Sequence, residues 1–340
     1  MKKIVAALLI VLCLGGIYIG WQVFGPTLSA PEGKYFYIST GSSFAKVKSD
    51  LQRKQILSNT FFFDKLARQV KYDRQVKPGR YEIKKGASLY SLLRMIKSGN
   101  QVPVRLVINK LRTKEDLAKK IGQQFEPDSL EVIRFLSNND SLRTYGVDSH
   151  TVMTLVIPNT YLVNWNSSFK KVFGRLTDEH KKFWNPQRMQ KAAALNLSPK
   201  QVYTMASIVE EETNKLKDKG LIASVYINRI EKGMKLEADP TVKYAMRDFG
   251  LKRILYGHLT YPSPYNTYQN RGLPPGPICT PSAETIDAVL DAPDTDYIFF
   301  VAKPDFNGYS NFAVNYQDHL KYAKEYQLAL DELIRKKQGK

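Results

Sequence analysis

The stretch SPKQVYTMASIVEEETN, residues 198–214, reads as an amphipathic helix in which three consecutive glutamates follow an apolar stretch. Ser198 and Pro199 form a favourable start, because serine caps a helix and proline is tolerated at its first position. Four apolar residues recur at helical spacing and form one stripe: Val202, Met205, Ala206 and Val209. We expect Leu216 to continue this stripe. The pattern predicts a helix with one face in a core and three adjacent acidic side chains after its apolar residues.

The three glutamates point in different directions from such a helix. At about 100° per residue, Glu211 falls opposite the apolar stripe and Glu210 lies on a polar flank. Glu212 has apolar neighbours one turn away on both sides, namely Ile208, Val209 and Leu216. A fold would therefore bury Glu212, and a buried carboxyl tends to keep its proton near neutral pH. Such a proton can be donated to a leaving group, as in glycosidases. The alternative is a glutamate that pairs with an arginine or caps a neighbouring helix.

The N-terminal segment Ile4–Phe24 is 21 residues long and carries no charge, which is enough to cross a membrane. Lys2 and Lys3 precede it and the next basic residue is Lys34, so the charge bias places the N-terminus in the cytoplasm. The rival interpretation is a cleaved signal peptide, but the apolar run is long for one. We expect an uncleaved single-pass anchor in the cell (inner) membrane, with everything from about residue 30 onward on the extracytoplasmic side.

The chain carries 51 basic against 32 acidic residues, a net charge of +19. Nucleic acid is the usual partner of such a charge, but an exported chain rarely meets any, so no nucleic-acid partner is expected. Residues 34–105 hold 16 Lys or Arg against 4 Asp or Glu. Anionic lipid headgroups and the acidic polymer of a cell wall fit this charge, and so does a solvated surface without a partner. Cys13 lies in the anchor and Cys279 stands alone, so the exported part has no disulfide available.

The exported chain, at 310 residues, is long enough for two domains. Residues 34–105 read as a small α+β module with a strand at 35–39, helices from Ser42 or Ser43 and over about 60–70, a strand in KPGRYEIKKG, a helix stopped by Gly99, and a strand at 102–108. The rest is mostly helical, with a β-hairpin around residues 304–308 and a last helix over about 316–337. The predicted fold class is α+β.

The central motifs resemble the endolytic murein transglycosylase (YceG-like) family. The similar segments are TMASIVEEETN, ASVYINRIEKGMKLEADPTVKYA, PSPYNTYQNRGLPPGPICTPS and YIFFVA with FNGYSNFAVNYQDH. The resemblance covers nearly the whole chain. It implies a single-pass membrane protein with a LysM-like module before the catalytic domain, hence an anchor over 1–30, a LysM-like module over 31–105 and a catalytic domain over 106–340.

In this family the catalytic residue is the second glutamate of an I-[IV]-E-x-E-T motif, which falls on Glu212. The resemblance implies cleavage of the β-1,4 bond between N-acetylmuramic acid and N-acetylglucosamine within peptidoglycan strands. Glu212 would protonate the glycosidic oxygen and then deprotonate the muramoyl 6-hydroxyl, which gives a 1,6-anhydro end without consuming water. The resemblance also implies a role in ending nascent strands beside the peptidoglycan synthases. No cofactor is expected.

Several motifs suit the binding of a sugar polymer, because they offer amides, hydroxyls, ring faces and close backbone approach. The candidate substrate-binding residues are Asn228, Arg229, Asp239, Thr241, Tyr265, Asn266, Thr267, Tyr268, Gly272, Leu273 and Pro274. Each of them is about as compatible with an ordinary loop role. Whether Asp239 assists catalysis stays open at this stage. Residues 272–276 should form a stiff loop wall.

Two positions depart from the family pattern. Asn159 stands where many members carry an aspartate, and the strand ending in LVINKLRT lacks the Glu-Gly that often follows it. Other chemistries fit less well. Two S-x-x-K patterns begin at Ser43 and Ser167 without the companion motifs of penicillin-interacting enzymes. The histidines are scattered without a metal-binding spacing, and His319 reads as structural. The serious alternative is a membrane-anchored peptidoglycan-binding scaffold without activity.

Overall fold

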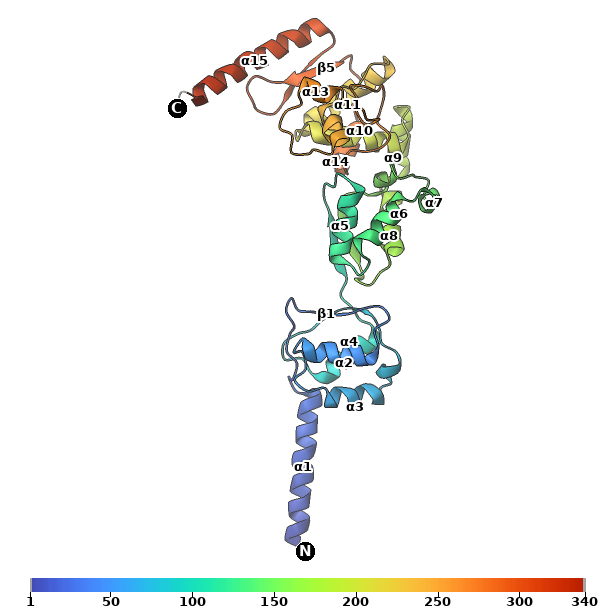
Figure 1. Ribbon diagram of the computed structural model, residues 1–340, viewed down its shortest axis with the longest axis vertical. Helices are drawn as coiled ribbons and strands as arrows, with labels where there is room; N and C mark the ends of the chain where they lie inside the picture. Colours follow the sequence, from blue (N-terminus) through green and yellow to red (C-terminus); the bar gives the residue numbers. More distant parts are fainter. Residues whose placement is uncertain (1, 339–340) are drawn as a thin grey trace. The chain divides into compact units, whose positions relative to one another are not determined.

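The computed structural model describes residues 2–338, and their side chains as far as residue 336 (Figure 1). The chain divides into two compact units. The first comprises residues up to 106 together with 122–128 and 162–169, and the second comprises 107–121, 129–161 and 170 onward. Helices and small sheets occur in both units, so the predicted mixture of helix and sheet is confirmed.

The first unit begins with a long apolar helix and continues as a small α+β module. Its elements are α1 (Lys2–Phe24), β1 (Tyr35–Ile38), α2 (Phe44–Arg53), α3 (Phe61–Gln69), the 3-10 helix η1 (Tyr72–Arg74), β2 (Gly79–Glu82) and α4 (Leu89–Ser98). Helix α1 is long and apolar enough to cross a membrane, and it buries none of its residues in the protein. Strands β1 and β2 pair antiparallel, with Tyr35 opposite Glu82 and Ile38 opposite Gly79.

Local signals decide where the helices of this module begin and end, and here the predictions from sequence are confirmed. The Ser43 hydroxyl accepts from the Lys46 amide at 3.2 Å and caps α2. Gly99 ends α4 with a φ of 76°, a left-handed conformation that favours glycine. The apolar faces of these helices meet the inner face of the β1–β2 pair in one core, which includes Phe36, Leu51 and Ile96.

The second unit is mostly helical. Its elements are α5 (Lys114–Gln124), α6 (Ser129–Ser137), α7 (Asn139–Arg143), the 3-10 helix η2 (Val152–Leu155), α8 (Phe169–Phe183), α9 (Pro186–Ala194), α10 (Pro199–Glu212), α11 (Leu216–Glu231), α12 (Asp239–Met246), α13 (Tyr256–Leu259), α14 (Ala283–Leu290), β5 (Phe299–Ala302), β6 (Ser310–Ala313) and α15 (Tyr316–Gln338). Strands β3 (Val104–Ile108) and β4 (Asn159–Val163) form another two-stranded sheet. Strand β4 was not predicted from sequence.

Helix α10 is the central element of the second unit and packs against α9, α11, α12 and α14 (Figure 1). All eight residues from Val202 to Val209 are buried. The predicted apolar stripe is therefore in the core, and the other faces of this part of the helix are buried as well. Its polar residues are satisfied locally, since Ser207 donates to the Thr204 carbonyl and accepts from the Ile278 amide. A fully enclosed helix is a rigid support for the side chains at its end.

The C-terminal elements form a hairpin and a covering helix. Strands β5 and β6 pair antiparallel with Phe299 opposite Ala313, which confirms the predicted hairpin. Helix α15 packs against both strands and was also predicted. Its first turn brings Tyr316 and His319 next to Phe299, with the His319 ring stacked at 5.0 Å between centroids.

Candidate active site

The three glutamates occupy the last turn of α10. Ser198 begins the helix with a capping box completed by Gln201, and Thr213 ends it in an extended conformation. The carboxyl end of a helix carries a partial negative charge, so adjacent acids there are unfavourable unless each is compensated. The structure compensates each glutamate in a different way.

Glu210 belongs to a buried polar network. One carboxylate oxygen accepts from Lys219 at 2.9 Å, from Ser282 at 3.2 Å and from Thr285 in a short hydrogen bond. Burial alone would raise the pKa of Glu210, but the hydrogen bonds from Thr285 and Lys219 outweigh it and lower the pKa. Glu210 is therefore held as a carboxylate.

Glu211 is bound by two cations from the segment that follows β3. Lys110 lies 2.8 Å from one carboxylate oxygen and Arg112 lies 3.2 Å from the other. The side chain is mostly buried, although Glu211 was placed opposite the apolar stripe. This segment is also the place where the family's Glu-Gly is missing, and here its Lys110 takes part in holding α10.

Glu212 has no cationic partner within ion-pair distance among the described residues. One oxygen accepts a hydrogen bond of 2.7 Å from the Tyr226 hydroxyl of α11. The side chain lines a pocket, yet surrounding protein atoms desolvate its carboxyl. This burial raises the pKa of Glu212 to about 7, opposed by the Tyr226 hydrogen bond and assisted by the charge of Asp239. Glu212 can therefore both hold and release a proton near neutral pH.

The apolar surroundings of Glu212 differ from those expected. Helix α10 stops at Glu212, so Leu216 starts the next helix and is 58% exposed instead of covering the carboxyl. The apolar residues that line the pocket with Glu212 are Leu236, Phe299 and Phe300. The expectation for Leu216 is wrong because it extended helical spacing across Thr213.

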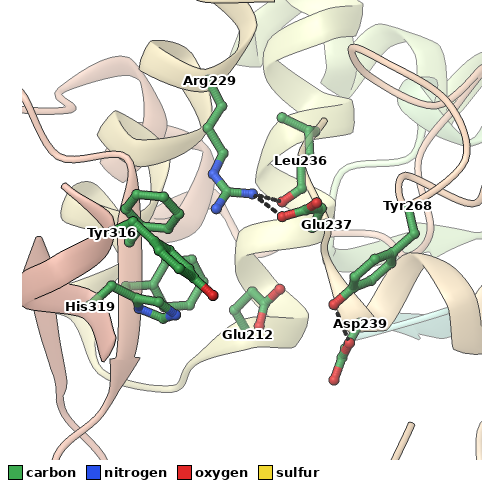
Figure 2. Close-up of a pocket in the computed structure, with 10 residues that line it drawn as sticks. Glu212, Arg229, Leu236, Glu237, Asp239, Tyr268, Tyr316 and His319 are labelled. Atoms are coloured by element: carbon green, nitrogen blue, oxygen red, sulfur yellow. Dashed lines mark hydrogen bonds and ion pairs between the residues drawn. The ribbon is translucent and has the colours of Figure 1, made fainter. Parts of the chain in front are cut away.

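The pocket has a volume of about 340 Å³ and places Glu212 between two walls (Figure 2). One wall carries Tyr316 and His319, and the other carries Tyr268 and Asp239. The Nδ1 atom of His319 is buried without a hydrogen-bond partner, and burial lowers the pKa of this histidine. Aromatic rings that flank a carboxyl with a pKa near 7 suit the binding of a ring-shaped neutral ligand.

Arg229 lies above Glu212 and connects the surrounding segments. Its guanidinium group donates to the Ile298 carbonyl at 2.7 Å, to the Leu236 carbonyl at 3.0 Å and to Glu237 at 3.1 Å (Figure 2). Only 9% of its side chain is exposed. Arg229 thus connects the segment that enters β5, on the side of Tyr316 and His319, to the loop before α12, on the side of Asp239.

The second wall depends on a buried set of threonines. The Tyr268 hydroxyl donates to Asp239 at 2.8 Å. Thr241 and Thr267 share a hydrogen bond of 2.8 Å, and Thr267 accepts from the Ala238 amide at 3.0 Å. These buried contacts fix the Tyr268 loop to the start of α12, so that Tyr268 and Asp239 face the pocket together.

The structure thus brings together four of the residues singled out from sequence. Glu212, Arg229, Asp239 and Tyr268 line the pocket, while the other candidates lie behind it. Asn228 donates to two carbonyls before β5, Asn266 donates to two carbonyls near α13, and Thr241 and Thr267 are buried. Tyr265 packs on Tyr244, and Gly272, Leu273 and Pro274 are absent from the pocket lining.

The close backbone approach expected for residues 272–276 occurs at Gly276. A Cβ atom there would collide with the His150 carbonyl oxygen, so the glycine is required by contact within the protein. The neighbouring Gly272 has a φ of 76°, which also favours glycine. Asn159 lies in a separate pocket, where its amide donates to Glu179 at 3.3 Å.

Sequence reasoning missed several residues of the site. Tyr226 and the lining residues Leu236, Glu237, Phe299, Phe300 and Tyr316 were not singled out, and His319 was interpreted as structural although it also lines the pocket. All of them lie within the motifs that carry the family resemblance, which was the available signal. Within residues 2–338, no group of three or more His, Cys, Asp or Glu is arranged to hold a metal ion.

Comparison with known proteins finds relatives of this chain in the family that its motifs resemble. The sequence model of the YceG-like family matches residues 36–325. The endolytic murein transglycosylase of Bacillus subtilis (strain 168) is 27% identical over 339 residues, which cover 93% of this chain and 91% of that protein. The endolytic murein transglycosylase of Streptococcus pneumoniae (serotype 2, strain D39) is 26% identical, with 94% of this chain and 64% of that protein covered. A crystal structure of a yceG-like protein from Listeria monocytogenes aligns with a TM-score of 0.55 and 26% identity, over 84% of this chain and 98% of that one.

Proposed function

Since the chain belongs to the YceG-like family, we propose that it is an endolytic lytic transglycosylase of peptidoglycan. It cleaves the β-1,4 bond between N-acetylmuramic acid and N-acetylglucosamine inside glycan strands. The observation that carries the proposal concerns the carboxyl of Glu212, which faces a pocket and has no cation paired to it among the described residues. The pKa of this carboxyl is raised to about 7. The names of the relatives in Bacillus subtilis and Streptococcus pneumoniae support the same activity.

In the first step Glu212 acts as a general acid. Its proton goes to the glycosidic oxygen while the bond from that oxygen to C1 of the muramoyl ring breaks, so the N-acetylglucosamine leaves as an alcohol. A pKa near 7 leaves a large fraction of Glu212 protonated at neutral pH. The nearby Asp239 is then well placed to favour the positive charge that develops at C1.

In the second step the same side chain acts as a general base. The Glu212 carboxylate removes the proton from the muramoyl 6-hydroxyl, and the oxygen bonds to C1 to close a 1,6-anhydro ring. Glu212 regains the proton that it gave up, and no water enters the reaction. A single catalytic carboxyl therefore suffices, unlike the two carboxyls of most glycosidases.

We further propose that the predicted substrate-binding residues have two different roles. Tyr268 and Asp239 contact the sugar, because they line the pocket beside Glu212. Arg229 lines it too, but its guanidinium group donates to protein carbonyls and to Glu237, so it mainly positions the walls. The remaining candidates act behind the wall, where they hold the loops: Asn228, Thr241, Tyr265, Asn266, Thr267, Gly272, Leu273 and Pro274.

The proposal includes a location. Helix α1 serves as a single-pass anchor in the cell (inner) membrane, with its N-terminus in the cytoplasm and the catalytic domain outside, as the positions of Lys2 and Lys3 favour. Residues 31–105 then act as a LysM-like module and residues 106–340 as the catalytic domain. In this position the enzyme could end nascent strands next to peptidoglycan synthases.

Mass spectrometry of glycan strands incubated with the full chain tests the activity. We expect 1,6-anhydro ends from the wild type and from Glu284→Gln, a control acid exposed on α14. Glu212→Gln should abolish these ends, while binding of the strands persists. If Glu212→Gln still yields anhydro ends, Glu212 is not the proton donor. If the wild type yields no anhydro ends but still binds strands, the chain is a binding scaffold.

A further inference from the structure

The end of helix α1 is tied directly to the core of the small module. Leu28 is buried in this core, four residues after α1 ends at Phe24. Its amide donates to the Ala87 carbonyl at 3.1 Å, and its carbonyl accepts from the Gly86 amide at 2.9 Å. Four extended residues reach at most about 14 Å. The turn between β2 and α4 therefore lies within that distance of the end of the apolar helix.

Aromatic side chains continue the surface of α1 onto the module. Phe24 contacts Tyr90 of α4 at 5.4 Å between ring centroids, and Tyr18 contacts Phe62 of α3 at 6.0 Å. Tyr90 is 46% exposed and Phe61, next to Phe62, is 57% exposed. Tyr18 lies about 9 Å before Phe24 along the helix axis. Large exposed aromatic rings near the end of a membrane-spanning helix are typical of the interface between membrane and water.

Exposed basic residues without an ion pair lie on the same segments as these rings, namely α3, α4 and the turn before α4. Lys84 and Lys85 are exposed on the turn tied to Leu28, and Arg94 is exposed one helical turn after Tyr90. The Lys65 ammonium group lies 5.8 Å from the centroid of the Phe61 ring. No ion pair involves these four basic residues among the described residues. By contrast, Lys48 and Arg68 of the same module are both paired with Asp64.

We propose that this surface is a lipid-docking face, defined by Phe61, Lys65, Lys84, Lys85, Tyr90 and Arg94, that rests on the membrane and binds anionic lipid headgroups. The inference rests on the proposed anchoring by α1. A lipid surface fits better than a cell-wall polymer, because the short tether keeps the face next to the bilayer and the rings supply the apolar contact that a headgroup region accepts. Docking restricts how far the module can swing on its anchor.

Fluorescence quenching of the full chain in nanodiscs tests the proposal. In a Cys13→Ser background, one fluorophore is attached at Phe61→Cys and another at Ser39→Cys. Ser39 is exposed and directly follows β1, which lies on the side of the unit away from α1 (Figure 1). Lipids with a nitroxide on the headgroup should quench the label at 61 more than the label at 39. Addition of phosphatidylglycerol to phosphatidylcholine should strengthen this quenching.

The dependence on phosphatidylglycerol is assigned to the basic residues by charge reversal. Lys84→Glu with Lys85→Glu should remove the strengthening of quenching by phosphatidylglycerol. Each lysine should account for up to about fivefold in the ratio of quenched to unquenched label. Lys46→Glu with Arg105→Glu changes the net charge equally at exposed sites outside the face and should have little effect. Equal quenching at 61 and 39, or no response to phosphatidylglycerol, overturns the proposal. So does a response to soluble anionic wall polymer alone.

Recovery of the chain with the nanodiscs reports separately on the anchor. Release of anhydro ends by the same sample reports on the enzyme. A failure of docking is therefore distinguishable from a failure of the proposed function. Lys84 and Lys85 are far along the chain from Glu212 and belong to the other compact unit, so the charge-reversed variant should keep its cleavage of solubilised strands.

Discussion

At the scale of single residues, the site depends on three adjacent acids that make different contacts. Glu210 and Glu211 are matched with cations, whereas Glu212 receives only the Tyr226 hydroxyl. The cations paired with Glu210 and Glu211 reduce the repulsion among the acids at the carboxyl end of the helix. Glu212 has no such partner among the described residues, and its pKa is raised. Helical spacing predicted that Glu212 is the glutamate with a desolvated carboxyl, but the apolar residues beside it are Leu236, Phe299 and Phe300 and not the expected Leu216.

The raised pKa of Glu212 carries a cost in stability that depends on pH. The pKa is about 7 in the folded protein against 4.5 for an ordinary glutamate in the unfolded chain, so the folded state holds more protons between these values. The contribution of Glu212 is therefore fully present below pH 4.5 and is lost as the pH rises through 7. We expect Glu212→Gln to be more stable than the wild type above pH 7, by about 3 kcal/mol.

Denaturation of both proteins at pH 4.5 and at pH 8 checks this prediction. The glutamine amide can still accept from Tyr226, so the variant leaves the local packing nearly unchanged. The advantage of Glu212→Gln should shrink toward zero at the lower pH. An advantage of the same size at both values would mean that ionisation of Glu212 is not the cause.

Tyr226 should set the pH range in which the enzyme works. Its hydroxyl donates to Glu212 and stabilises the carboxylate, so Tyr226→Phe should raise the pKa of Glu212 further. The alkaline limb of the pH–rate profile should then move to higher pH, with a loss of about 1 kcal/mol in stability. Tyr203→Phe is the matched control, because the Tyr203 hydroxyl donates to the Val156 carbonyl in the same core. The control should lose stability without a shift of the limb.

At the scale of elements, the chain segment after β3 stabilises the end of α10. Lys110 and Arg112 both contact Glu211, and neither partner was foreseeable, because about 100 residues separate them from α10. Lys110→Ala and Arg112→Ala should each destabilise the protein by about 1 kcal/mol, since a mostly buried carboxylate loses a partner. Thermal denaturation measures the effect.

A double-mutant cycle separates this ion pair from general effects of the substitutions. In a Glu211→Gln background the same alanine substitutions should cost much less. Because the charge of Glu211 also raises the pKa of Glu212, loss of the cations should shift the alkaline limb upward as well. Additive costs in the cycle would contradict the role assigned to Glu211.

The beginnings and ends of elements were predictable where local chemistry decides them. Ser43, Ser198 and Gly99 act as caps in the predicted way. Strand β4 was missed, because its partner β3 lies about 50 residues away and only that pairing makes it a strand. The end of α10 was placed too late, because the apolar Leu216 lies at helical spacing from Glu212 across the break at Thr213.

The pocket walls could not be predicted for a related reason. Phe299, Tyr316 and His319 are 87 or more residues away from Glu212 in the sequence. They reach it only because β5 packs on α11 and α15 packs on β5. No periodicity in the sequence reports such a contact. Thr241 and Thr267 were predicted to bind substrate, because they are polar residues in a recognisable motif. In the structure both threonines are buried and do not line the pocket.

At the scale of the whole molecule, the two compact units have separate cores. All residues that line the pocket belong to the second unit. Removal of residues 1–24 should therefore take the protein out of the membrane fraction while cleavage of solubilised glycan strands continues. Fractionation and product analysis check this expectation. Loss of cleavage in the truncated protein would show that the anchor takes part in catalysis.

The most direct measurement is the titration of the Glu212 carboxyl itself. Carbon-13 NMR of glutamate side-chain carboxyls in the full chain, with Glu212→Gln used to assign the signal, gives its pKa without reference to activity. The mechanism predicts a midpoint near 7, and a higher one in Tyr226→Phe. A midpoint near 4.5, with the carboxyl ionised throughout the neutral range, would contradict the role of Glu212 as the proton donor.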